Sequence, residues 1–219
     1  MRKTIIALMA CLTITLGAIS IKNEIIFTSE DHSKSVAVKA DSQTKSLSRG
    51  GLPIQAQPAK SDKTPKYGEL VSWKESNNLI PRGTTVKVTD LETGKTFNIK
   101  RTFGTNHLDG ESPSVADTDI IKSIWGGFSW ERRPVLVTIN GKSIAASMSA
   151  MPHAGIDSEP SEATVSNRSD DYGRGVNLDA IKNNGMDGVI DIHFLNSTRH
   201  KDNKPDPEHQ AAILKAAGK

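Results

Sequence analysis

The stretch that decides the fold is residues 134–148, which read PVLVTINGKSIAASM. Two apolar runs flank the Asn-Gly pair at 140–141, and this pair favours the two-residue turn of a β-hairpin because both residues tolerate a positive φ. The stretch therefore predicts two antiparallel strands, at 134–139 and 142–148, and with them a β-rich domain.

Further strands are predicted on both sides of this hairpin. Residues 85–91 and 96–101 alternate between apolar and polar side chains and enclose the turn sequence ETGK, so they predict a second hairpin. Residues 188–195 read GVIDIHFL and predict a buried strand. The predicted fold class is mainly β (β-rich α+β), with antiparallel hairpins forming a sandwich or barrel and a few packed helices.

Two helices are predicted from their end signals. Ser114 and Asp117 form a capping pattern before an apolar face, and Gly126-Gly127 ends that helix. Asp206-Pro207 begins the second helix near the C-terminus, because proline is favoured at the first helical position.

The N-terminal part of the chain predicts export. Arg2 and Lys3 carry positive charges, and residues 4–21 carry none. This pattern is typical of a secretory signal or an N-terminal membrane anchor, here over residues 1–30. Residues 31–66 are polar and contain no aromatic residue, so they predict a flexible linker. The folded domain is predicted over residues 67–219, with a polar insertion at 156–186.

Composition limits the chemistry that the exported part can perform. The only cysteine of the 219 residues is Cys11, inside the apolar N-terminal run, so disulfides, cysteine zinc sites and thiol nucleophiles are excluded downstream. The formal net charge is +3, without the basic excess that nucleic-acid binding requires. We expect an extracytoplasmic protein, secreted or anchored at a Gram-positive cell envelope, with membrane contact only through its N-terminal segment.

Histidines and aspartates lie at or beside the predicted strands. His107 is followed by Asp109, His153 follows the central hairpin, and Asp191 precedes His193 by two residues in one strand. Alternation along a strand places Asp191 and His193 on the same face. Burying either side chain unpaired is unfavourable, so the two residues either pair with other groups or face solvent. His200 and His209, in the polar C-terminal part, are interpreted as solvated.

The order of these motifs resembles the catalytic segment of the YkuD-type L,D-transpeptidases. That family has a His-Gly, a spacer, and then Ser/Thr-x-Gly-Cys-Ile-Arg-x-x-Asn, and the corresponding parts here are His153-Ala-Gly and residues 188–196. The resemblance implies a transpeptidase-like fold, peptidoglycan peptides as ligand, and a catalytic set of His153, Asp191 and His193. Asp191 stands at the position of the family's nucleophilic cysteine, so conventional cysteine-dependent transpeptidation is not expected. The segment around His153 is also similar to secreted wall-associated modules of Gram-positive bacteria.

Three functions are compatible with these residues. The first is a divergent transpeptidase-like domain that binds or processes peptidoglycan peptides. The second is a zinc-dependent peptidoglycan amide hydrolase with His107, Asp109 and His193 as metal ligands, because two histidines and one carboxylate are typical of a catalytic zinc site with an open position. The third is a non-catalytic wall-binding or structural module. Zinc is the only cofactor that the residues suggest.

Overall fold

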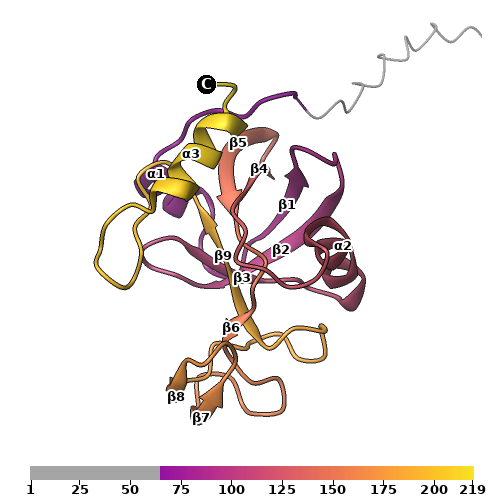
Figure 1. Ribbon diagram of the computed structural model, residues 1–219, viewed down its shortest axis with the longest axis vertical. Coiled ribbons are helices and arrows are strands. Elements are labelled where there is room, and N and C mark those ends of the chain that lie inside the picture. Colours follow the sequence, from indigo (N-terminus) through magenta and orange to yellow (C-terminus); the bar gives the residue numbers. More distant parts are fainter. Residues whose placement is uncertain (1–64) are drawn as a thin grey trace, which may run out of the picture. The chain divides into compact units, whose positions relative to one another are not determined.

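The computed structural model describes residues 65–219, and the predicted signal or anchor lies outside these residues, as does the linker up to residue 64 (Figure 1). The elements follow one another in this order: α1 (Trp73–Leu79), β1 (Thr85–Asp90), β2 (Thr96–Phe103), β3 (Leu108–Glu111), α2 (Val115–Trp125), β4 (Arg133–Ile139), β5 (Lys142–Met148), β6 (His153–Ala154), β7 (Thr164–Arg168), β8 (Gly173–Val176), β9 (Gly188–His193) and α3 (Pro207–Ala216). Among the helices of residues 65–219, none combines the length and apolar character that a membrane span requires.

Six antiparallel strands close into a barrel. Their order is β3-β2-β1-β4-β5-β9, and a further pairing between β3 and β9 joins the two ends of the sheet. The predicted mainly β fold class is confirmed, and of the two predicted arrangements the barrel is the one found. Both predicted hairpins are present, as β1–β2 and β4–β5. Because β3 and β9 pair with each other, neither is left as an open edge of the barrel sheet.

The interior of the barrel is filled by alternate residues of its strands. On β5 and β9 the inward side chains are Ile144, Ala146, Met148, Ile190 and Ile192, all fully buried in the main apolar core. The residues between them therefore face outward. Two of the outward-facing barrel residues, Leu136 and Ala145, pack against Ile213 and Ala216 of α3. This helix covers the outer face of β4 and β5 (Figure 1).

The helix ends follow the sequence signals. The Ser114 side chain accepts from the Asp117 N–H at the start of α2, and Gly126 ends this helix with a φ of 75°. Asp206 caps α3 by accepting from the N–H groups of Glu208 and His209. Both predicted helices are therefore confirmed.

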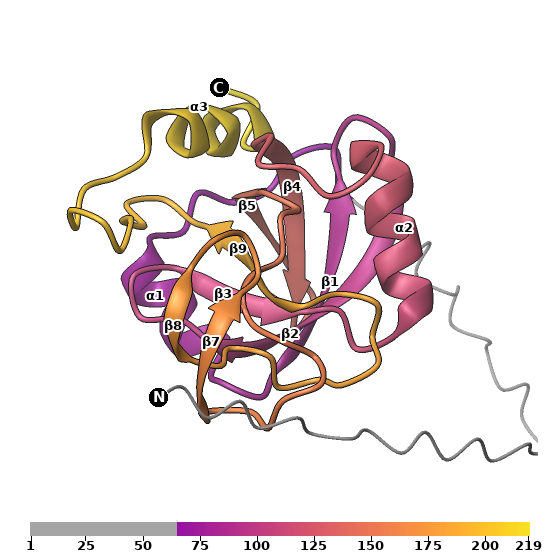
Figure 2. The same ribbon diagram turned by 60° about the horizontal axis from the view of Figure 1, so that its bottom comes forward.

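The predicted insertion at 156–186 lies to one side of the barrel, below it in Figure 1 and in front of it in Figure 2. It contains the two-stranded sheet β7–β8. The buried carboxylate of Glu111 on β3 accepts hydrogen bonds from the N–H groups of Ala180 and Ile181, and Asp179 accepts one from Gly188. These carboxylates fasten the insertion to the barrel strands that carry the site described below.

A buried ion pair fixes the end of β1. The fully buried Asp90 carboxylate accepts from Arg133 Nε at 3.0 Å and from the Thr93 N–H at 2.8 Å. Burial opposes ionisation of Asp90, but the hydrogen bonds of Arg133 and Thr93 outweigh it and lower the pKa of this carboxyl below its ordinary value.

Replacing Asp90 by asparagine is expected to lower the free energy of unfolding at pH 7 by about 2 kcal/mol, because it removes a charged acceptor from a buried network. A carboxyl whose pKa is lowered in the folded state stabilises the fold above the ordinary aspartate range and stops doing so as pH falls through the lowered pKa. Urea unfolding should therefore show a difference between Asp90→Asn and the parent chain that shrinks in acid. Asp119→Asn, at an exposed position, is the control; an equal loss in both variants would contradict the assigned role of the pair.

Candidate functional site

Four predicted site residues form one cross-strand cluster. Asp109 of β3 lies opposite Asp191 of β9, and the next pair in the ladder is Leu108 and Ile192. Leu108 and Ile192 point into the barrel core, so Asp109 and Asp191 point outward, and His107 and His193 lie beside them on that outer face. The register of the strand pair that closes the barrel thus brings together two segments more than 80 residues apart in the sequence.

Neighbouring elements cover this outward face. The helix α3 supplies His209, the loop of residues 194–206 supplies His200, and β5 with the residue after it supplies Ser147 and Ser149. His209 is only 2% exposed, whereas the His200 side chain is 54% exposed. The cluster is therefore buried beneath α3 and opens towards solvent on the His200 side.

Each carboxylate of the cluster contacts two histidines. Asp191 Oδ2 lies 3.3 Å from His193 Nε2 and 3.4 Å from His209 Nε2, and its other oxygen accepts from the Ser149 hydroxyl. Asp109 lies 2.9 Å from His107 Nε2 through Oδ1 and 3.5 Å from His200 Nε2 through Oδ2. Both aspartates thus serve as centres of histidine pairs.

The three buried histidine rings form a stack. The centroids of His107 and His193 are 4.2 Å apart, and those of His193 and His209 are 3.9 Å apart with nearly parallel planes. Outer hydrogen bonds hold two of these rings: His107 Nδ1 donates to the Thr198 carbonyl at 2.8 Å, and His209 Nδ1 lies 2.9 Å from Ser147 Oγ. This arrangement leaves the Nε2 atoms of both rings directed at the carboxylates.

The charges of the cluster are strongly coupled. Burial lowers the pKa of His107, but the hydrogen bond and charge of Asp109 outweigh it and raise this pKa to about 9. For Asp109 burial is likewise outweighed, here by His107 and His200, which lower its pKa to about 2. His193 and His209 hold the pKa of Asp191 well below its usual range despite burial.

His193 behaves differently from His107. Burial is the largest cause that lowers its pKa, to about 4, and the charges of His209 and His107 act in the same direction against the attraction of Asp191. At neutral pH the cluster therefore contains ionised carboxylates beside a neutral imidazole. His107, with its raised pKa, is protonated at the same pH. Ligands of a divalent cation must be deprotonated, so Asp109, Asp191 and His193 are ready to bind one, whereas His107 would have to release a proton when the ion binds.

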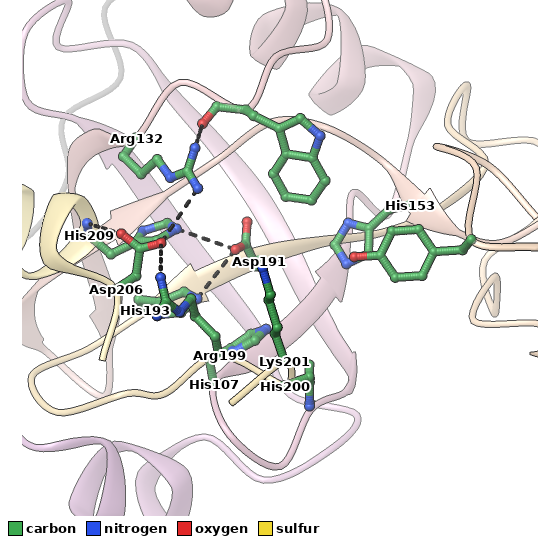
Figure 3. Close-up of a pocket in the computed structure, with 12 residues that line it drawn as sticks. His107, Arg132, His153, Asp191, His193, Arg199, His200, Lys201, Asp206 and His209 are labelled. Atoms are coloured by element: carbon green, nitrogen blue, oxygen red, sulfur yellow. Dashed lines mark hydrogen bonds and ion pairs between the residues drawn. The ribbon is translucent and has the colours of Figure 1, made fainter. Parts of the chain in front are cut away.

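A pocket of about 180 Å³ opens beside the cluster. Figure 3 shows Asp191 between the stacked histidines on one side and His153 on the other. The His153 ring lies between the rings of Trp130 and Tyr172, with centroid distances of 5.1 and 5.0 Å, and its Nδ1 donates to the Met151 carbonyl. His153 thus forms part of an aromatic wall, with its Nε2 not used in that hydrogen bond.

Charged residues line another side of the pocket. They are the basic residues Arg132, Arg199 and Lys201 and the acidic residue Asp206. Arg199 is paired with Asp202 at 2.7 Å, and Arg132 lies 3.5 Å from Asp206. A ligand in this pocket would lie between the aromatic wall and these charged residues, over the Asp191 carboxylate.

The structure brings together the predicted catalytic and metal residues, but it divides them differently from the sequence prediction. His107, Asp109, Asp191 and His193 belong to the cluster, and His153 lines the same pocket outside it. The predicted metal set of His107, Asp109 and His193 is not one of the groupings found. The donor atoms within 4.8 Å of one another form two sets, one of His107, Asp109 and His200, the other of His107, Asp191 and His193.

The interpretation of His209 as solvated is wrong, and His200, although exposed, contacts Asp109. A signal for His209 was present in the sequence. His209, Ile213 and Ala216 recur at i, i+4 and i+7, so they share the face of α3 that packs on the barrel. For His200 the sequence offers no such signal, because its position depends on the path of the loop 194–206.

A serine nucleophile is not supported by this geometry. Ser147, His209 and Asp191 form a hydrogen-bonded chain that resembles a Ser-His-Asp triad. However, Ser147 is fully buried and does not line the pocket, and its hydroxyl contacts Nδ1 of His209. Ser147 therefore holds the ring of His209 in place.

The residues fit a divalent cation. Two ligand atoms of a tetrahedral zinc site, each 2.0–2.1 Å from the ion, lie about 3.4 Å apart. Asp191 Oδ2 lies at such a distance from His193 Nε2 and from His209 Nε2, 3.3 and 3.4 Å. The set with all donor atoms within 4.8 Å of one another is Asp191, His193 and His107. In addition, the buried His193 Nδ1 has no hydrogen-bond partner among residues 65–219, so protein groups do not satisfy this ring completely. Comparisons with protein-family models, with curated proteins and with solved structures find no significant match to this chain.

Proposed function

We propose that this protein is an exported, zinc-dependent hydrolase that cleaves amide bonds of peptides in the cell envelope. The observation that carries the proposal is the convergence of buried His107, Asp191 and His193, with donor atoms within 4.8 Å of one another, at a pocket. Export and the envelope substrate rest on the N-terminal sequence pattern and on the resemblance to the transpeptidases.

The hydrogen bonds around the cluster support a metal-binding role. Histidines that bind metals usually donate their second ring nitrogen to a carbonyl or carboxylate, which fixes the tautomer. His107 does so towards the Thr198 carbonyl. The Ser149 hydroxyl donates to Asp191, and His209 Nδ1 contacts the Ser147 hydroxyl. The ligating atoms of His107, Asp191 and His209 are thus oriented by groups that lie outside the pocket, whereas His193 Nδ1 has no such partner among residues 65–219.

The pocket favours catalysis over a purely structural metal site. A catalytic zinc site has three protein ligands and an open position, and zinc bound in this way lowers the pKa of water to about 7 and polarises a carbonyl group. Asp191 and His193 line the pocket, so the open position would face it. His153 lines the same pocket, and its Nε2 is not used in the hydrogen bond to Met151, so we assign this residue to proton transfer with the leaving amine.

The environment of Asp191 argues against a transpeptidase mechanism. An acyl acceptor must be accessible, but Asp191 is 7% exposed and is engaged by Ser149, His193 and His209. The three contacts are those of a ligand held in place. Non-catalytic binding of wall peptides remains the alternative that the test below separates.

The test is metal analysis and amide hydrolysis with the full chain purified without chelators. We expect bound zinc, release of new amino groups from soluble peptidoglycan peptides, loss of release in the presence of a chelator and its return with added zinc. Chelation should also lower the melting temperature, because ligand binding to the folded state stabilises it by mass action. Peptide binding without amine release in the zinc-loaded protein would favour the non-catalytic module, and absence of zinc would overturn the proposal.

A further inference from the structure

The cluster has an internal two-fold arrangement. An antiparallel strand pair has a local two-fold axis, and here the axis relates Asp109 to Asp191 because these residues are directly opposed. The same operation relates His107 to His193. The sequence His-x-Asp, which runs from the residue before β3 into that strand, and the sequence Asp-x-His at the end of β9 are therefore two copies of one motif, which face each other where β3 and β9 pair to close the barrel.

Each copy of the motif acquires a second histidine from the covering elements. Asp191 contacts His193 and also His209 of α3, at 3.3 and 3.4 Å. Asp109 contacts His107 at 2.9 Å and also His200 of the loop 194–206 at 3.5 Å. Both halves thus contain two imidazoles around one carboxylate, a set that zinc and other divalent transition metals accept.

His107 cannot complete both halves at once. Its Nδ1 donates to the Thr198 carbonyl, so Nε2 is its single ligand atom, and this atom lies 2.9 Å from Asp109. When His107 serves the Asp109 half, His209 remains to complete the Asp191 half. The cluster therefore contains enough donors for two separate three-ligand sites.

We propose that the cluster holds two divalent cations, one bound by Asp191, His193 and His209 and the other by His107, Asp109 and His200. This proposal rests on the proposed function and makes the hydrolase a two-metal enzyme. His107 and His193 belong to different halves, and their ring centroids are only 4.2 Å apart. The two ions would therefore lie close to each other, as the paired metals of two-metal enzymes do.

The two sites differ in access. The Asp191 site lies beneath α3, with all three of its ligands buried. The Asp109 site includes the half-exposed His200 and so opens to solvent. Asp191, His193 and His209 are not one of the sets with all donor atoms within 4.8 Å of one another among residues 65–219, and the rings of His193 and His209 are nearly parallel. One of these rings must therefore turn about its Cβ–Cγ bond for both to bind one ion. We expect the ion of the Asp109 site to enter and leave on the side of the pocket where His200 lies.

The experiment measures zinc stoichiometry in the full chain after equilibration with excess zinc and removal of unbound metal. The parent chain is expected to retain two equivalents, and His200→Ala one. His209→Ala is also expected to retain one equivalent. His153→Ala, which removes a pocket histidine outside both sets, is the matched control and should retain two.

The outcomes separate this inference from the proposed function. One equivalent in the parent chain and in His200→Ala would overturn the two-metal centre and leave a single-zinc hydrolase standing. Two equivalents in His200→Ala would overturn the assigned ligand set. No bound zinc in the parent chain would overturn both proposals. Because His200 is half-exposed, its replacement tests the inference even if His209→Ala fails to fold.

Discussion

Replacing His193 by alanine is expected to lower the affinity for the ion bound at Asp191 by at least about 100-fold. Changes to groups that merely orient a ligand already cost 10–100-fold in metal affinity, and His193 is proposed to be a ligand itself. Amide hydrolysis should fall to the level of the chelated parent chain. Zinc titration of the full chain, followed by the amine-release assay at saturating zinc, measures both effects.

The control for His193→Ala is His153→Ala, because both variants remove a buried histidine, His193 from β9 itself and His153 from β6, the strand paired with β9. Far-ultraviolet circular dichroism of the two variants in chelator shows whether the barrel is intact. We expect normal zinc affinity but impaired hydrolysis in His153→Ala, as befits proton transfer without metal ligation. Parent-like zinc affinity in a folded His193→Ala variant would refute the assignment of His193.

The barrel was largely predictable because its strands carry local signals. The Asn-Gly turn at 140–141 and the alternation over residues 85–101 identified four strands, and the apolar run at 188–195 identified β9. By contrast, β3 was not predicted. Residues 108–111 contain two acidic residues and a glycine, which do not favour a strand locally, and they form one because they pair with β2 and β9. Helix α1 has a complete capping box at Ser72 and Glu75 and could have been predicted from it.

The candidate site was predictable in residue type but not in grouping. Alternation correctly placed Asp191 and His193 on one face, yet the partner of Asp191 across the ladder depends on the register between β9 and β3. Register is a long-range property, and a shift by one residue would turn Asp109 into the core. The third ligands, His200 and His209, enter through a loop and a helix packed on the outer face, which local patterns do not specify.

Gly104 sets the position of the first half of the site. It precedes β3 with a φ of +100°, a conformation that L side chains rarely adopt. A Cβ at this residue would collide with the carbonyl oxygen of His107 and would lie 2.6 Å from the backbone nitrogen of Asp109. Both neighbours are backbone atoms of the segment that carries His107 and Asp109, so relief of the collision has to move these side chains.

Gly104→Ala is therefore expected to destabilise the fold by about 3 kcal/mol or more, through backbone strain together with the collision. In a domain of this size the melting temperature should fall by roughly 6–12 °C. Gly83→Ala is a closely matched control, since Gly83 has a φ of +93° but nothing within 4 Å of an added Cβ, so only the strain of about 1 kcal/mol applies.

Thermal unfolding of the two variants in chelator isolates the effect on the fold. Zinc titration then tests the site: the ion at Asp109 should bind more weakly in Gly104→Ala alone, and equal melting temperatures and affinities in both variants would show that Gly104 does not hold β3 in place.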